Sequence, residues 1–104
     1  MNSEELSLQS RPKRQPPYGV ILHNDDLNSF DYVIDSIRNV FHYELEKCYQ
    51  LTLEAHETGR SLLWAGPLEG AELKQELLLS CGPDPVMRKK GALPLIVTLE
   101  ELPQ

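Results

Sequence analysis

The sequence predicts an α+β fold: a single small domain of order β-α-α-β-α-β, with a three-stranded antiparallel sheet packed against three helices. Short apolar runs of strand length alternate with longer stretches in which apolar residues recur at helical spacing. A length of 104 residues allows one domain with a modest core. The content of 40% hydrophobic and 25% charged residues is typical of a globular protein.

The first two elements follow from apolar spacing. The apolar run at 19–23 predicts the first strand. A helix is predicted from Phe30 to Phe41, capped by Asn28 or Ser29, because its apolar residues share one helical stripe. That stripe consists of Phe30, Val33, Ile34, Ile37, Val40 and Phe41.

A second helix is predicted at 44–58, and Gly59 suits the position that follows a helix. The stretch 60–65 then predicts a short strand, which Gly66 and Pro67 end. The inner face of the second helix is predicted to hold Leu45, Cys48, Thr52 and Ala55.

A third helix is predicted at 68–80, followed by a loop at 81–92 with three consecutive cations at 88–90. The β-branched run 93–99 predicts the last strand, and Pro94 within it indicates an edge position or a strand start. The third helix carries Leu73, Leu77 and the neighbouring Leu78.

Residues 1–17 are polar and contain three prolines, which predicts a disordered arm ahead of a folded core at 18–104. The arm either has no function or offers a flexible segment that another protein could grip. The first residues lack a signal-peptide pattern, and no apolar run is long enough for a membrane span. The two cysteines have no metal-like spacing, so a reducing, cytoplasmic compartment is predicted.

The net charge of −6 is concentrated in the segment 24–57. A nucleic-acid surface requires the opposite sign, so the segment indicates either an ordinary solvated helix surface or attraction for amine-bearing partners. Its eight acids are Asp25, Asp26, Asp31, Asp35, Glu44, Glu46, Glu54 and Glu57, against Arg38 and Lys47.

The sequence contains no Gly-rich phosphate loop, no G-x-S-x-G and no H-E-x-x-H motif, which argues against an enzyme. An acidic metal-dependent enzyme is a further alternative, but no short ligand spacing supports it, so neither metal nor cofactor is predicted. The conceivable metal ligands are His23, Asp25, Asp26, His42 and His56.

The predicted first strand runs directly into Asn24, Asp25 and Asp26. These residues are common turn formers, which is one interpretation; the other is a ring of acceptors around a cation site. His56, in the last turn of the second helix, either caps that helix or approaches Asn24 and Asp26.

An amide oxygen, an imidazole nitrogen and a carboxylate together could satisfy the three donors of an α-ammonium group. The apolar residues beside them would form a hole of side-chain size. This combination predicts recognition of a chain N-terminus that bears a bulky hydrophobic residue. The predicted lining is Leu22, Phe30, Val33 and Ala55.

The motifs at 20–26, 30–34 and 55–60, V-I-L-H-N-D-D, F-D-Y-V-I and A-H-E-T-G-R, resemble those of the ClpS family. These proteins are adaptors, without catalysis of their own, that deliver N-degron substrates to a ClpA- or ClpC-type AAA+ unfoldase. The resemblance covers about 17–101.

The resemblance implies that Asn24 and His56 bind the substrate α-amino group and that Asp26 assists directly or through water. It implies that Asp25 and Asn28 contact the peptide backbone or shape the loop. It also implies a monomer whose arm engages the unfoldase, and an unfoldase-facing pair at Glu69 and Lys74. From the residues alone, that pair is an ordinary exposed charge pair.

Three residues depart from the family pattern. Phe30 stands where many members have a methionine at the pocket entrance, Leu27 replaces a frequent aromatic residue, and Thr52 replaces a larger apolar residue in the pocket. The preference among Phe, Leu, Tyr and Trp as first residue therefore stays open. The alternative function is a small α+β interaction domain without a ligand pocket, similar in architecture to ribosomal stalk domains.

Overall fold

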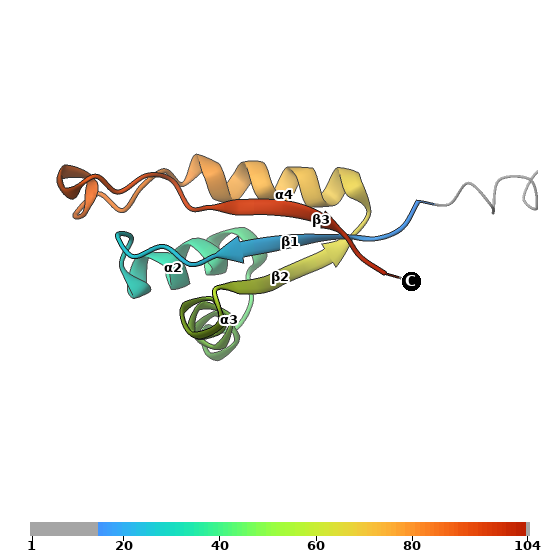
Figure 1. The fold of residues 1–104 in the computed structure, drawn as a ribbon, viewed down its shortest axis with the longest axis horizontal. Coiled ribbons are helices and arrows are strands. Elements are labelled where there is room, and N and C mark those ends of the chain that lie inside the picture. The colour runs from blue at the N-terminus through green and yellow to red at the C-terminus, as the bar shows by residue number, and fades with distance from the viewer. Residues whose placement is uncertain (1–14, 104) are drawn as a thin grey trace, which may run out of the picture.

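The computed structural model describes residues 15–103, and most of the predicted arm, 1–14, lies outside this range. The element order β-α-α-β-α-β is confirmed, with one additional 3₁₀ helix, η2, inside the predicted loop (Figure 1). The elements are β1 (Tyr18–His23), α2 (Phe30–Phe41), α3 (Leu45–Thr58), β2 (Arg60–Gly66), α4 (Leu68–Ser80), η2 (Arg88–Lys90) and β3 (Val97–Glu101).

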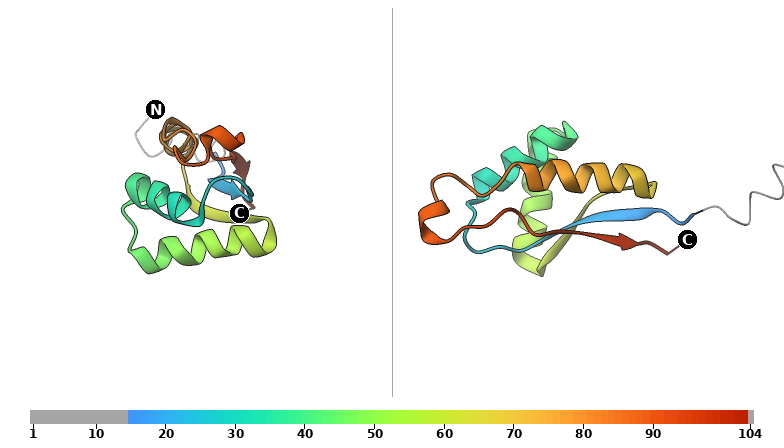
Figure 2. Two further views of the ribbon diagram at one scale, coloured as in Figure 1. Left: turned by 90° about the vertical axis from the view of Figure 1, so that its left-hand side faces the viewer. Right: turned by 90° about the horizontal axis from the view of Figure 1, so that it is seen from above.

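The three strands form an antiparallel sheet in the order β2-β1-β3, so β1 is the central strand. Figure 2 shows the helices gathered on one side of this sheet. A bulge leaves Leu63 of β2 without a partner on β1, between Trp64 opposite Val20 and Leu62 opposite Ile21, and Leu63 and Trp64 both pack against the core. The pairing on both sides of β1 fixes the position at which this strand ends.

Alternate residues of β1 point toward the helices. Val20 and Leu22 belong to the core, where Ile37, Cys48 and Leu78 are fully buried. Burial of these apolar side chains supplies most of the driving force for folding.

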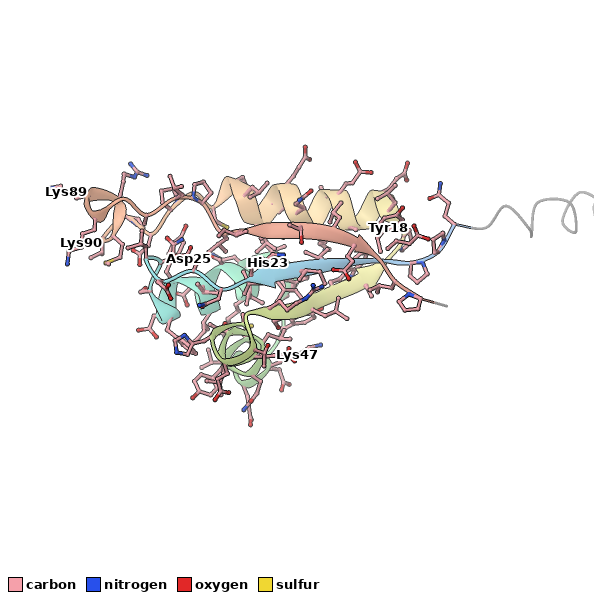
Figure 3. All side chains as sticks on the ribbon, viewed as in Figure 1. Tyr18, His23, Asp25, Lys47, Lys89 and Lys90 are labelled. Atoms are coloured by element: carbon pink, nitrogen blue, oxygen red, sulfur yellow. The ribbon has the colours of Figure 1, made fainter. Side chains whose placement is uncertain are left out.

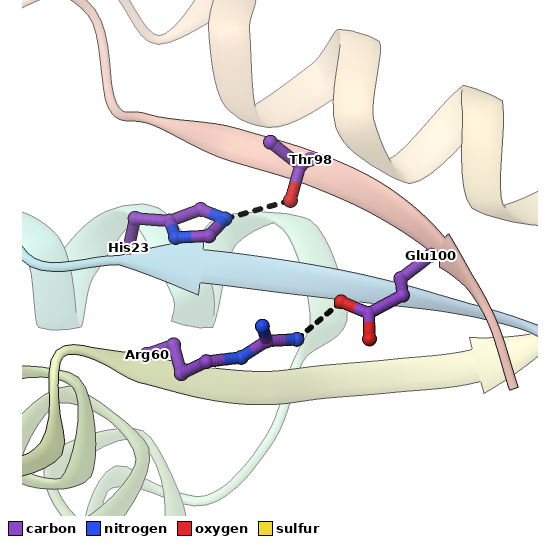
Figure 4. A network of polar contacts seen from close by, with 4 residues as sticks. All are labelled: His23, Arg60, Thr98 and Glu100. Carbon is purple, nitrogen blue, oxygen red and sulfur yellow. Dashed lines mark hydrogen bonds and ion pairs between the residues drawn. The ribbon is translucent and has the colours of Figure 1, made fainter.

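The opposite face of the sheet carries polar pairs (Figure 4). His23 Nε2 and Thr98 Oγ1 lie 2.7 Å apart, and Arg60 forms an ion pair with Glu100. Ile21, which is buried, alternates onto this face as well, so the face combines polar pairs with apolar contacts.

The helix starts and stops follow the predicted chemistry. Ser29, rather than Asn28, caps α2: its Oγ accepts a hydrogen bond from the Tyr32 amide at 3.1 Å. Gly59 ends α3 with a φ of 97°, a left-handed conformation that favours glycine.

The predicted inner face of the second helix is corrected, because Leu45 is exposed. In α4, Leu73 and Leu77 are also exposed, whereas Ala71 and Leu78 are the buried residues. Leucines at consecutive positions 77–79 give α4 no clear stripe, so hydrophobicity alone did not identify its inner face.

The last strand is also corrected, because β3 begins at Val97 and not at residue 93. Ile96 O still accepts from the His23 amide of β1 at 2.9 Å, whereas residues 93–95 leave the sheet: Leu93 O accepts a side-chain hydrogen bond from Asn28, and Leu95 is buried. Pro94 precedes this edge strand, in agreement with the expectation for proline. Within the described residues, no helix is both long enough and apolar enough to cross a bilayer.

Candidate functional site

A pocket of about 320 Å³ opens where the central strand β1 ends. Its walls come from the β1–α2 loop, from α2 and α3, and from the segment that precedes β3. All ten residues that the sequence suggested for the amine, the loop and the apolar hole lie in its lining. The lining residues are Leu22, His23, Asn24, Asp25, Asp26, Leu27, Asn28, Ser29, Phe30, Val33, Thr52, Ala55, His56, Met87 and Leu95.

The polar rim combines Asn24, Asp26 and His56. Asn24 and Asp26 are adjacent, since Asn24 Nδ2 donates to Asp26 Oδ1 at 3.3 Å. The Asn24 backbone N–H donates to Gly59 O at 2.9 Å, which ties the end of β1 to the end of α3. Because His56 lies one turn before Gly59, this bond brings the imidazole to the same rim as the amide and the carboxylate.

The apolar wall has a buried base and an aromatic side. Val33, Thr52 and Ala55 are buried at the base. The Phe30 ring lies against α3, with its centroid 5.7 Å from that of Tyr49 and 6.1 Å from that of His56 in an edge-on arrangement. The Phe30 ring therefore forms part of the pocket wall and does not fill the pocket volume of about 320 Å³.

Thr52 contributes a hydroxyl to the otherwise apolar base of the pocket. This hydroxyl donates to Cys48 O at 2.8 Å, one turn earlier in α3. Its proton is thus used within the helix, and its methyl group adds apolar surface to the base.

Asp25 and Asn28 are held by hydrogen bonds within the loop. The Asp25 carboxylate accepts from the Leu27 amide at 2.7 Å, from the Asn28 amide at 3.0 Å and from Asn28 Nδ2. Asn28, only 6% exposed, also donates to Leu93 O at 2.8 Å and accepts from the Asp84 amide at 2.8 Å. These two side chains therefore shape the loop.

The segment 81–92 is fastened to the same loop. The buried Asp84 carboxylate accepts from the amides of Ser29 at 3.2 Å and Val86 at 3.0 Å. The Tyr32 hydroxyl donates to both Cys81 O and Gly82 O at 2.7 Å. These hydrogen bonds hold the segment so that Met87, which follows Val86, lies in the pocket wall.

Sequence reasoning missed Met87 and Leu95 as lining residues. They reach the pocket through the hydrogen bonds of Asn28 and Asp84, which join positions 56 and 65 residues apart along the chain. Pairings over such distances have no local signal. Asn28 and Asp84 are residue types that are common in turns, so neither residue alone indicates a link between the two segments.

Hydrogen bonds lower the pKa of Asp84, chiefly through the Ser29 side chain and also through the Ser29, Val86 and Met87 amides. A lowered native pKa means that this carboxylate stabilises the fold above its ordinary value of 3.8, and that the contribution is lost as the pH falls through the native pKa. We expect Asp84→Asn to reduce the free energy of unfolding at pH 7, and the difference from wild type to shrink below about pH 4.

Urea unfolding at pH 7, 5 and 3 measures this difference, with Asp35→Asn at an exposed position of α2 as the control. A difference that stays constant from pH 7 to pH 3 would contradict the role of the Asp84 charge.

The remaining predicted residues lie elsewhere. Glu69 is exposed on α4, and Lys74 is half-buried with its Nζ 5.7 Å from the centroid of the Phe41 ring. Neither lines the pocket. In the range 15–103, no cluster of three or more His, Cys, Asp and Glu side chains is arranged to hold a metal ion.

Comparison with known proteins gives consistent results. Residues 13–84 match the family model described as ATP-dependent Clp protease adaptor protein ClpS. The chain is 36% identical over 97 residues to the ATP-dependent Clp protease adapter protein ClpS of Campylobacter jejuni, covering 93% of this chain and 92% of the relative. It is 30% identical over 100 residues to that of Vibrio atlanticus, covering 94% and 89%.

A solved structure, that of Agrobacterium tumefaciens ClpS2 bound to L-phenylalaninamide, is similar with a TM-score of 0.71 at 26% identity. The similarity covers 86% of this chain and 100% of the other, and it confirms the predicted fold. The relatives are named adapter proteins, which confirms the prediction of a non-catalytic partner of a Clp protease. On these matches, the chain belongs to the ClpS family of ATP-dependent Clp protease adaptors.

Proposed function

We propose that this adaptor binds the free N-terminus of substrates with a bulky hydrophobic first residue and delivers them to the Clp protease. The observation that carries the proposal is the rim of Asn24, Asp26 and His56 above an apolar pocket of about 320 Å³. The similar ClpS2 structure supports it, because L-phenylalaninamide presents an α-amino group and a benzyl side chain together.

In this proposal, the α-ammonium group donates to the Asn24 side-chain oxygen, to the His56 imidazole and to Asp26, directly or through water. The Asp26 carboxylate also supplies the opposite charge. The first side chain enters the apolar pocket, where Leu22, Phe30, Val33, Thr52 and Ala55 surround it. Binding the amine and the side chain at once restricts the site to chain ends.

The delivery step is assigned to surfaces outside the pocket. Glu69 and Lys74 on α4 are proposed to face the N-terminal domain of a ClpA- or ClpC-type AAA+ unfoldase, and the arm at 1–17 to engage the same partner. Because neither residue lines the pocket, substrate and unfoldase could be held at the same time. A monomer acting in the cytoplasm completes the proposal.

We expect Asn24→Ala to weaken capture of Phe- or Leu-initiated peptides by at least about tenfold, since one hydrogen bond to a charged group is worth about 1.5–3 kcal/mol. Fluorescence anisotropy with labelled peptides beginning with Phe, Leu, Tyr, Trp, Lys or Asp measures both affinity and first-residue preference. Asn39→Ala, at an exposed position of α2, is the matched control.

An interaction domain that does not use its pocket gives a different result. There, Asn24→Ala would change only the stability of the loop, and the peptide panel would show no dependence on the first residue. Either result would exclude the proposed site.

A further inference from the structure

The 81–92 segment carries a cluster of charge that the proposed function does not use. The cluster consists of Arg88, Lys89 and Lys90, which we call the basic tip; all three are exposed. None of them forms an ion pair with another residue in the described range. The chain has no acidic residue between Asp84 and Glu100, and Asp84 is buried in the hydrogen bonds that fasten the segment. Along the chain, the basic tip therefore has no acidic neighbour that is exposed.

The basic tip lies next to the pocket. Arg88 directly follows the lining residue Met87, so their Cα atoms are about 3.8 Å apart. Figure 3 shows Lys89 and Lys90 at the same end of the molecule as Asp25, another lining residue. Exposed charges act on one another within about one Debye length, about 10 Å at 0.1 M salt, so a cluster beside the pocket wall can act on a ligand at the pocket mouth.

The backbone holds the basic tip in place. Met87 O accepts hydrogen bonds from the Lys90 amide at 2.9 Å and the Ala92 amide at 3.2 Å, and Gly91 ends the turn with a φ of 95°. A 3₁₀ helix has three residues per turn, so three consecutive side chains point in three different directions. The three cations are therefore spread around the turn and not aligned on one side of it.

We propose that the basic tip makes this adaptor prefer substrates with acidic residues at the second to fourth positions, directly after the bulky first residue. The pocket rim is negative at Asp26, where the α-ammonium group binds, and the neighbouring segment is positive. A substrate N-terminus that is positive at its first atom and negative a few residues later matches both charges. The inference rests on the proposed function, whose site it extends.

The experiment compares three peptides that differ only in charge: Phe-Glu-Glu, Phe-Gly-Ser and Phe-Lys-Lys, each followed by the same neutral, C-terminally labelled sequence. At low salt, we expect the acidic peptide to bind about threefold to tenfold more tightly than the lysine peptide, as for exposed ion pairs. Salt of about 0.5 M should largely remove this ratio.

Two sets of variants locate the effect. Arg88→Gln combined with Lys89→Gln and Lys90→Gln should bring the three affinities together while leaving the neutral peptide unchanged, and Lys89→Glu should favour the lysine peptide. Lys47→Glu, at an exposed position of α3 that does not line the pocket, changes the net charge equally and should leave the ratio unchanged.

The failure of this inference differs from that of the proposed function. If all three peptides bind equally, or if Lys47→Glu acts like Lys89→Glu, the basic tip has no role in selection although the pocket stands. If none of the Phe-initiated peptides binds, the proposed function itself fails. If the glutamine variant weakens all three peptides equally, the tip supports the pocket without reading charge, which also overturns the inference.

Discussion

Acetylation of the α-amino group is expected to weaken binding of a Phe-initiated peptide by about 100-fold or more. The acetyl group removes the positive charge and two of the three donors that the site is proposed to satisfy. Each lost hydrogen bond to a charged group costs about 1.5–3 kcal/mol. The acetyl carbonyl also places a further hydrogen-bond acceptor beside the acceptors of the rim, with which it cannot form a hydrogen bond. The total therefore exceeds about 3 kcal/mol, which corresponds to more than 100-fold in affinity.

Isothermal titration with the free and acetylated forms of one peptide measures this loss. A C-terminal amide on the same peptide is the control, because it removes a charge far from the pocket and should leave the affinity unchanged. Equal affinities for the free and acetylated peptides would rule out Asn24, Asp26 and His56 as the amine site.

Asn28→Ala is expected to lower the free energy of unfolding by about 2–4 kcal/mol and to abolish peptide capture. The substitution leaves the Asp84 amide and the Leu93 carbonyl without their side-chain partner, and Asp25 loses one of its donors. An unpaired buried polar group costs about 1–3 kcal/mol, and more than one is left here. The segment that carries Met87 would also lose its attachment to the pocket.

Denaturant unfolding and anisotropy on the same preparations measure the two effects, with Asn39→Ala as the matched substitution in an exposed position. If Asn28→Ala unfolds at the wild-type midpoint, the side chain is not the link between the two segments. A variant that is destabilised but binds normally would show that the pocket does not depend on this link.

The elements were predictable where the determining signals are local. The stripe from Phe30 to Phe41 and the glycine at 59 concern neighbouring residues, and both boundaries of α2 and the end of α3 agree with the structure. The correct order of strands and helices follows from the alternation of these short-range patterns.

The start of β3 and the inner face of α4 were not predictable in the same way. Apolarity at 93–96 has the appearance of a strand, but only Ile96 still bonds to the backbone of β1, and Leu93 bonds to the Asn28 side chain instead. In α4, Gln75 Nε2 donates to Val97 O at 2.8 Å, so a polar side chain lies toward the sheet while Leu73 and Leu77 face outward. Tertiary contacts determine both the start of β3 and the inner face of α4, in opposition to local hydrophobicity.

For the pocket, motif and geometry contributed different parts. The motifs containing Asn24 and His56 identified residues that line one cavity, although their binding roles stay predictions. Met87 and Leu95 are found only from the structure, because the polar links that deliver them join distant positions.

The walls of the pocket come from residues as far apart as Leu22 and Leu95, which span most of the described chain. A substrate that binds as proposed would contact both ends of this span, so it would recognise only the native molecule. By mass action, its binding free energy then adds to the stability of the adaptor, by about 2.7 kcal/mol at a cargo concentration 100 times the dissociation constant. An adaptor with a modest core is accordingly most resistant to unfolding while it is loaded.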